Sequence, residues 1–254
     1  MILARLTRAI REQNWFAVVL EFVIVIAGVV IGFQVTAWNA DRSERVREAA
    51  YLERLHAEVE ELESLRGWRV ASRQRHAANL VEVADFLHDR RDITPGEWHC
   101  TAIGMSFTVT NPTDRLGVLD ELLSVGGFDT IRSPDVREAI ARYMLATRRA
   151  ADANTGSEFQ IVILHDRFPE LFEVETVRIR PDADLLRPQF ECDFDAMRAN
   201  TEFRHAFATN AFSFTSHNRQ NELVSEALRH LHDAVDQTLG LTAEDHDTGQ
   251  EDAA

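Results

Sequence analysis

Cysteine is scarce in this sequence, which contains only Cys100 and Cys192 among its 254 residues. Neither cysteine belongs to a CxxC pair, so the usual zinc-ribbon and thioredoxin-like folds are excluded. The two thiols can form a disulfide if the body folds in an oxidising compartment. We instead expect two unpaired and partly buried thiols, because free cysteine behaves as a small hydrophobic residue.

Catalytic signatures are also missing. The sequence contains no GxSxG nucleophile motif, no HExxH metal motif and no glycine-rich phosphate loop. None of the ten histidines form a pair at i,i+4 spacing, and His230 and His232 would point to different faces of a helix. His165 and Asp166 are adjacent and diverge in the same way. We therefore expect no catalytic residue, no metal ligand and no cofactor.

Basic residues are also few relative to acidic ones. All 27 basic residues are arginine, and they face 42 acidic residues, so the formal net charge is −15. Residues 1–38 carry a local balance of +1, and the remainder of the chain sums to −16. Nucleic acids are bound through clustered positive charge, so this balance argues against DNA or RNA as a partner. A hydrophobic fraction of 45% with fifteen Phe residues predicts a folded body.

One long apolar run lies between Trp15 and Trp38, and its stretch from Phe16 to Phe33 contains a single charge, Glu21. As a helix, this run nearly matches a hydrocarbon core of about 30 Å. We expect a retained transmembrane helix over 15–38, surrounded by the lipid bilayer, with Trp15 and Trp38 as interfacial anchors. A cleaved signal peptide is the alternative, but the run is long and no obvious small-x-small cleavage site follows it.

The orientation of this helix is nearly balanced by its flanking charges. Arginines lie on both sides of the span, at positions 5, 8 and 11 before it and at positions 42, 45, 47 and 54 after it. The positive-inside count is therefore close to even. A long C-terminal domain can be translocated regardless of such charges, so we expect the N-terminus in the cytoplasm and the body outside it.

A GxxxG motif, formed by Gly28 and Gly32, lies inside the span and permits close approach of two helix backbones. At about 100° per residue, Glu21 and both glycines fall within about 40° of one another, and Val25 shares their face. An ionisable side chain at that depth tends to face a protein partner. We expect an interface along Glu21, Val25, Gly28 and Gly32, in a homo-oligomer or against another membrane protein. A chance GxxxG motif with a snorkelling or protonated Glu21 is the alternative.

The rest of the sequence predicts an all-α fold, in which the membrane helix continues into a long helix over 39–92. Strong helix formers dominate this stretch, and Gly67 is its weak point. Its apolar stripe has the 3-4-3 spacing of a short heptad seam and consists of Leu52, Leu55, Val59 and Leu62.

Residues 93–240 are expected to form a helical body. Helix starts are indicated at Thr94-Pro95, Asn111-Pro112 and Ser133-Pro134. Phe159–Phe172 is expected to form a further apolar helix, and 173–193 an irregular segment with at most a short strand. The chain ends in an acidic tail, 241–254, and begins with a basic tail, 1–14; the acidic tail is expected to be disordered.

The last long helix carries a seam at 4-3-4-3 spacing, which consists of Phe203, Phe207, Asn210, Phe214, His217, Asn221, Val224, Leu228, Leu231 and Val235. Its middle is polar. Asn210, His217 and Asn221 either fix the register or line a small ligand site, or this part of the seam is solvated, which is the interpretation that we favour here.

Several of these patterns resemble an uncharacterised family of bacterial single-pass membrane proteins, the domain-of-unknown-function family 6090. The first match combines the intramembrane Glu21 with Gln34, Trp38-Asn39 and Tyr51-Leu52 in a charged helix. The second is the leucine-rich stretch Leu119–Phe128 with the segment that follows it to Tyr143. The resemblance covers residues 20–145; it implies a bacterial inner-membrane protein with an α-helical body, and no activity. A body outside the cytoplasm would then be periplasmic.

The sequence therefore favours a non-enzymatic, membrane-anchored helical module that oligomerises or binds a membrane partner. One alternative is an extracytoplasmic sensor that binds a small ligand at Asn210, His217 and Asn221. Another is a membrane-tethered enzyme whose catalytic groups converge from separate helices.

Overall fold

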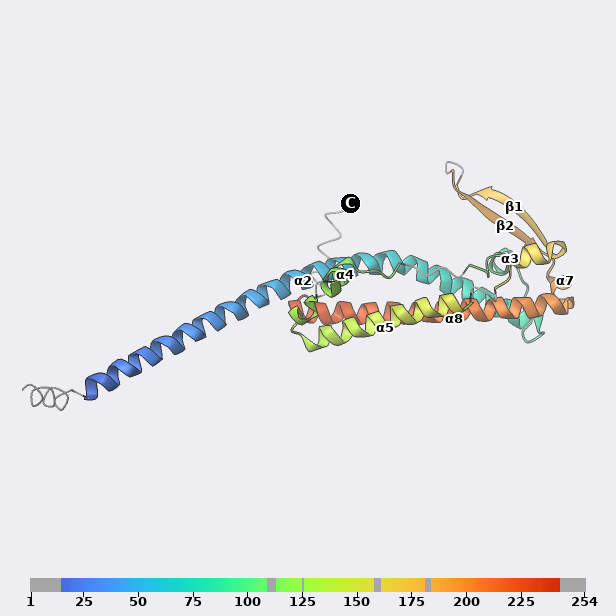
Figure 1. Cartoon of the computed structure of the whole chain (residues 1–254). Helices are drawn as coiled ribbons and strands as arrows, with labels where there is room; N and C mark the ends of the chain where they lie inside the picture. The colour runs from blue at the N-terminus through green and yellow to red at the C-terminus, as the bar shows by residue number, and fades with distance from the viewer. Residues whose placement is uncertain (1–14, 109–112, 125, 158–160, 181–183, 243–254) are drawn as a thin grey trace, which may run out of the picture. The chain divides into compact units, whose positions relative to one another are not determined.

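The computed structural model describes residues 15–108, 113–124, 126–157, 161–180 and 184–242 (Figure 1). The chain divides into two compact units, Met1–Tyr51 and Leu52–Ala254. Helices dominate, so the expected all-α fold with a long first and a long last helix is confirmed, and one hairpin of two short strands is added to it. The predicted basic tail 1–14 and residues 243–254 of the predicted acidic tail lie outside the described residues.

Seven α-helices, two 3₁₀ turns and two strands lie within the described residues. In chain order they are α2 (Trp15–Leu87), α3 (Glu97–Gly104), α4 (Gly117–Ser124), a 3₁₀ turn (Gly127–Thr130), α5 (Pro134–Ser157), α6 (Leu164–Arg167), a second 3₁₀ turn (Pro169–Leu171), β1 (Phe172–Arg178), β2 (Leu186–Cys192), α7 (Phe194–Ala199) and α8 (Thr201–Leu239).

The first unit consists of the N-terminal part of α2. Every residue from Val19 to Ala40 is exposed, and the most apolar 18-residue window of the helix has a mean hydropathy of 2.3, with none of it buried. By length and composition, this helix is apolar enough to cross a membrane.

The C-terminal end of α2 lies at Leu87, earlier than the predicted boundary at 92. Asp89 adopts a left-handed conformation with φ of 52°, and the N–H of Arg90 donates to the carbonyl of Asp85 at 2.9 Å. This hydrogen bond closes the last turn as in a Schellman motif, which requires a left-handed residue. α2 is continuous through Gly67, where the sequence predicted a weak point.

In the second unit, α5 and α8 lie side by side (Figure 1). They run antiparallel, because Ser133, which precedes α5, contacts Thr238 near the end of α8 at 3.3 Å. Further along, His217 of α8 contacts the carbonyl of Ala153 at 3.1 Å. The N-terminal cap of α5 is the predicted one, since the Ser133 hydroxyl accepts from the N–H of Val136 at 3.4 Å.

All ten predicted seam positions of α8 are buried, and so are the four seam positions of α2, Leu52 to Leu62. The expectation that the polar middle of the seam is solvated is therefore wrong: Asn210, His217 and Asn221 are only 0%, 3% and 1% exposed. The seam phenylalanines and apolar side chains of other elements form a core cluster that includes Leu80, Val83, Leu87, Ile103, Phe168, Phe203, Phe207 and Phe214.

Cys100 of α3 and Cys192 at the end of β2 form a disulfide, with their Cα atoms 5.6 Å apart. The expectation of two unpaired thiols is therefore wrong. The bridge joins the hairpin to α3 across 92 residues of sequence. Phe190 of β2 packs directly against Gly104, where a Cβ atom would lie 2.7 Å from its ring. The hairpin thus reaches α3 through both a covalent bond and a close apolar contact.

The expectation that 173–193 is irregular is also wrong. β1 and β2 pair antiparallel over seven positions each, with Phe172 opposite Cys192 and Thr176 opposite Pro188. Both strands of a two-stranded sheet are edge strands, where a proline can be placed without breaking an interior hydrogen-bond ladder.

The predicted helix over Phe159–Phe172 is wrong as well. Residues 158–160 lie outside the described part, and only Leu164–Arg167 forms a short α-helix. Pro169 explains the stop, because proline lacks an N–H and disfavours the helical conformation at the residue before it. Phe168 accordingly has φ of −129° and ψ of 58°.

Two other predicted helix starts have different outcomes. The cap of α3 is Gly96 rather than Thr94, and the N–H of Gly96 donates to Nδ1 of His99 at 3.0 Å. The helix start predicted at Asn111-Pro112 falls outside the described residues, and α4 begins at Gly117.

Candidate functional site

The predicted membrane interface lies on the first unit. Glu21, Val25, Gly28 and Gly32 are all exposed, and a Cβ atom built at either glycine meets no other described atom within 4 Å. The face is therefore open to another helix. Trp38 is exposed beneath the Arg42 guanidinium, which lies 5.9 Å from its ring centre. The side chain of Trp15, the other predicted anchor, lies outside the description.

Asn210 forms a hydrogen-bonded junction inside the second unit. Its Oδ1 accepts from the N–H of Val162 at 3.0 Å, and its Nδ2 donates to the carbonyl of Val162 at 2.7 Å and to the Ser106 hydroxyl at 3.0 Å. Three separate segments are thereby joined. Because a buried amide must satisfy its polar atoms, these contacts account for an asparagine in an otherwise apolar seam.

His217 and Asn221 are likewise bonded within the chain. The His217 ring contacts the carbonyls of Ser213 and Ala153 at 2.6 and 3.1 Å, and Asn221 donates to the His217 carbonyl at 3.1 Å. The carbonyl of Asn221 accepts from the buried guanidinium of Arg66 at 3.1 Å. Asn210, His217 and Asn221 thus hold helices together. None of them lines the clefts at His230 and His232 that are described below.

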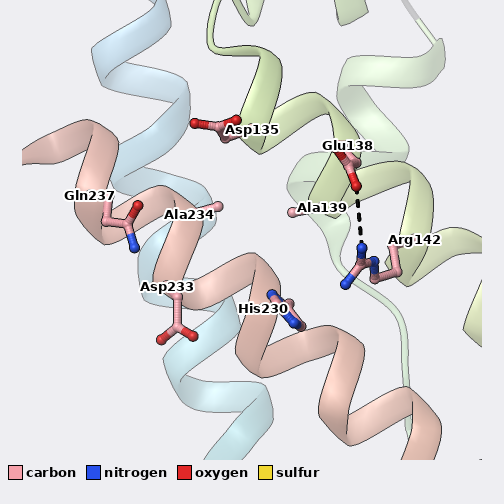
Figure 2. A pocket seen from close by; sticks show the side chains of 8 residues that line it. All are labelled: Asp135, Glu138, Ala139, Arg142, His230, Asp233, Ala234 and Gln237. Carbon is pink, nitrogen blue, oxygen red and sulfur yellow. Dashed lines mark hydrogen bonds and ion pairs between the residues drawn. The ribbon is translucent and has the colours of Figure 1, made fainter.

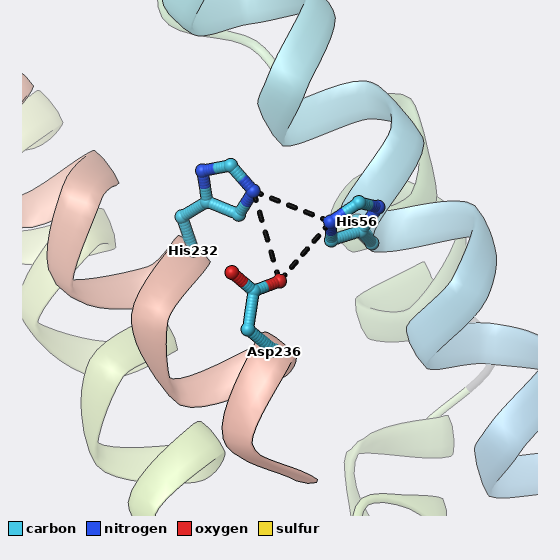
Figure 3. A group of neighbouring side chains, drawn as sticks. All are labelled: His56, His232 and Asp236. Atoms are coloured by element: carbon cyan, nitrogen blue, oxygen red, sulfur yellow. Dashed lines mark hydrogen bonds and ion pairs between the residues drawn. The ribbon is translucent and has the colours of Figure 1, made fainter. Parts of the chain in front are cut away.

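A second polar group was not predicted and joins α2 to α8. The Nε2 atoms of His56 and His232 lie 3.3 Å apart, and Oδ1 of Asp236 lies 3.0 Å from the first and 3.7 Å from the second. Figure 3 shows that the three atoms face one another at one point between the helices. The side chains of His56, His232 and Asp236 are 16%, 16% and 19% exposed. We call these three residues the His–His–Asp cluster.

Glu63 supports this cluster from α2. Its Oε2 lies 2.8 Å from Nδ1 of His232, on the side of the ring opposite to Nε2. The hydrogen bond to Glu63 raises the pKa of His232; burial opposes the shift, and the negative charges of Glu63, Asp236 and Glu60 add to it. The carboxylate therefore fixes both the orientation of the ring and the nitrogen that carries its proton.

The cluster depends on two helical spacings. His232 and Asp236 are four residues apart on α8, and His56 and Glu63 are seven apart on α2, so each pair shares a helix face. A rule that looks for two histidines at i,i+4 spacing misses this arrangement, whereas a histidine–aspartate pair at that spacing is a usable signal. The contact between the two helices is not visible in the sequence.

His230 lies two residues before His232 on α8 and borders one cleft together with it. It lines a groove of about 280 Å³ between α5 and α8, which Figure 2 shows to be surrounded by charged side chains. Arg142 and Glu138 form an ion pair there at 3.2 Å, and both are exposed. Exposed pairs of this kind contribute little, and ligand pockets are mostly apolar, so this groove indicates no particular ligand.

No family model, no curated protein and no solved structure matches this chain. The resemblance to the domain-of-unknown-function family 6090 stays a prediction.

Proposed function

We propose that this chain is a membrane-anchored helical protein of the bacterial inner membrane, with its body in the periplasm. Two observations support the proposal. The exposed apolar part of α2 is long enough to cross a bilayer, and the body carries a disulfide between Cys100 and Cys192. Disulfides persist in oxidising compartments such as the periplasm and are rare in the cytosol. The covalent bond therefore favours the orientation that the flanking arginines leave undecided.

Topology is tested with reporter fusions placed after Asn39 and after Gly240, one reporter active only outside the cytoplasm and the other only inside. The proposal expects the external reporter to be active at both positions. As a matched readout, the unfused protein is alkylated at its free thiols in intact cells before lysis. Activity of the internal reporter, together with two alkylated cysteines, would contradict the periplasmic orientation.

We further propose that the anchor helix associates with a second copy of itself along Glu21, Val25, Gly28 and Gly32. The observation that carries this proposal is the openness of the face at Gly28 and Gly32, next to an ionisable residue. In a bilayer, small residues allow close backbone packing, and a buried carboxyl group is stabilised by a polar partner. A homo-oligomer supplies both, since each copy brings its own Glu21.

Dimer trapping tests this association. Single cysteines are introduced as Val25→Cys and Gly28→Cys in membranes, with the native disulfide left oxidised so that it does not react. Matched controls are Val23→Cys and Val30→Cys, each turned by about 160° from the corresponding test position. Crosslinks at the test positions and weak ones at the controls are expected. Equal crosslinking at all four positions, or none, would refute the self-association.

The alternative of a small-ligand sensor gains no support from the polar residues of the α8 seam. A small ligand at Asn210, His217 and Asn221 would have to displace hydrogen bonds that already satisfy these side chains. A structural and interaction role is therefore the function that the described residues favour.

A further inference from the structure

The three donor atoms of the His–His–Asp cluster form a triangle with sides of 3.0, 3.3 and 3.7 Å. Zinc binds histidine nitrogen at about 2.0–2.1 Å and carboxylate oxygen at about 2.0–2.2 Å. In a tetrahedron, these bond lengths place two ligand atoms about 3.3–3.5 Å apart. Of the three distances between donor atoms, one is shorter than this separation, one matches it and one is longer. All three atoms can therefore hold one ion after side-chain shifts of a few tenths of an ångström.

The chemistry of the donor set fits the same ion. Two imidazoles and one carboxylate are ligands that divalent transition metals prefer, with zinc well suited to them. Metal-bound histidines usually donate their other N–H to a carboxylate, a backbone carbonyl or water. Glu63 supplies that interaction, because its Oε2 lies 2.8 Å from Nδ1 of His232. In the neutral ring this leaves Nε2, which faces His56 and Asp236, as the lone-pair nitrogen.

Charge and access favour a cation as well. Glu63 and Asp236 are both acidic, Glu60 adds a further negative charge near His232, and the whole chain is strongly acidic. Oδ1 of Asp236 is buried, but the three side chains are partly exposed, and Glu63 and His232 line a cleft that also reaches Asp233. An ion can thus enter from solvent, and water can complete a fourth position.

We propose that His56, His232 and Asp236 bind one divalent transition-metal ion, with zinc as the best fit, and that Glu63 positions His232 for this role. The bound ion joins α2 to the last turns of α8. It therefore clamps the C-terminal helix to the start of the body in the second unit. This site is independent of the proposed association of the anchor helix and goes beyond it.

The competing explanation is a hydrogen-bonded cluster without metal. Oxygen and nitrogen atoms 3.0 Å apart are within ordinary hydrogen-bond distance, and such a network would also join the two helices. The two explanations differ in what the protein does with a metal salt. A network binds no stoichiometric ion, whereas the metal site does.

Zinc binding is measured on the full-length chain in detergent, by equilibrium dialysis and elemental analysis, in a buffer alkaline enough to keep imidazoles neutral. One zinc ion per chain is expected, together with a rise in the thermal unfolding midpoint. His232→Gln and His56→Gln should each abolish this stoichiometric binding. Glu63→Gln, which retains all three ligands, should weaken it by about 10–100-fold.

His230→Gln is the matched control, because His230 lies on the same helix and borders the same cleft as His232 but is not one of the three proposed ligands. It should bind zinc as the wild type does. Circular dichroism of each metal-free variant shows whether the helices are retained. Cobalt added to the wild type provides a measurement that needs no variant, since a four-coordinate site gives intense visible absorption bands.

Failure of the wild type to bind zinc, or equal binding by the wild type and both His→Gln variants, would overturn the proposal. Weak cobalt bands of an octahedral ion would do the same. None of these outcomes bears on the dimer-trapping experiment, so the two proposals can fail separately.

Discussion

Removal of the disulfide should destabilise the second unit by a measurable amount. The perturbation is the double substitution Cys100→Ala and Cys192→Ala. The bridge closes a loop with a sequence separation of 92, for which the chain-entropy model gives a loss of about 4–5 kcal/mol at 25 °C. In a domain of about 200 residues, each kcal/mol shifts the unfolding midpoint by about 2–4 °C. The midpoint should therefore fall by roughly 10–20 °C.

The assay is thermal unfolding of the full-length chain in detergent, followed by far-ultraviolet circular dichroism with and without a reducing agent. The wild type should have no titratable thiols before reduction and should lose stability on reduction. The double alanine variant serves as the control, because a reducing agent should leave its midpoint unchanged. Equal midpoints for oxidised wild type, reduced wild type and variant would refute the reasoning, as would free thiols in protein isolated without reductant.

Four further substitutions are tested by urea denaturation. Asn210→Leu should cost about 2–3 kcal/mol, because it leaves backbone groups that the amide satisfies without partners. Tyr143→Phe removes a hydrogen bond to a backbone carbonyl and should cost about 1 kcal/mol. Burial raises the pKa of the Tyr143 phenol, so the unfolded chain loses this proton first. Wild-type stability from this group is therefore present below about pH 10 and falls as the pH rises further, whereas the Phe variant lacks this fall. Gly104→Ala should cost about 1–3 kcal/mol, since a Cβ atom would lie 2.7 Å from the Phe190 ring. Gly67→Ala, in an open helical position, should instead stabilise by about 0.5–1 kcal/mol.

The following results would contradict these predictions. Unchanged stability of Asn210→Leu would mean that its hydrogen bonds contribute nothing net. Parallel pH profiles for the wild type and Tyr143→Phe above pH 10 would contradict the raised pKa. Loss of stability in Gly67→Ala equal to that in Gly104→Ala would show that side-chain volume at Gly104 is not what matters.

The helical framework was predictable because its signals are local. A seam at 4-3-4-3 spacing indicates one buried helix face whatever that face contacts, and all ten seam positions of α8 are buried. The cap at Ser133-Pro134 is equally local, because the Ser133 hydroxyl bonds an N–H only three residues further on. Such patterns depend on a single turn of backbone and need no knowledge of the tertiary fold.

The errors arose where tertiary contacts decide the structure. Apolar residues between Phe159 and Phe172 suggested a helix, but Pro169 and the hydrogen bonds of Asn210 to Val162 favour an extended chain there. The expected solvated seam failed for the same reason, since partners for its polar atoms come from other segments. Pairing of Cys100 with Cys192 required the hairpin, which a weakly alternating sequence did not reveal.

The His–His–Asp cluster depends both on local helical spacing and on the tertiary contact between α2 and α8. Helical periodicity places His232 with Asp236 on one face of α8, and His56 with Glu63 on one face of α2. Periodicity says nothing about which turn of α2 meets which turn of α8. A change of one residue in that register would rotate the facing side chains by about 100° and separate the donor atoms. The register is held by buried neighbours such as Leu231 and Val235, so the proposed metal site exists only because apolar packing around it fixes the two helices against each other.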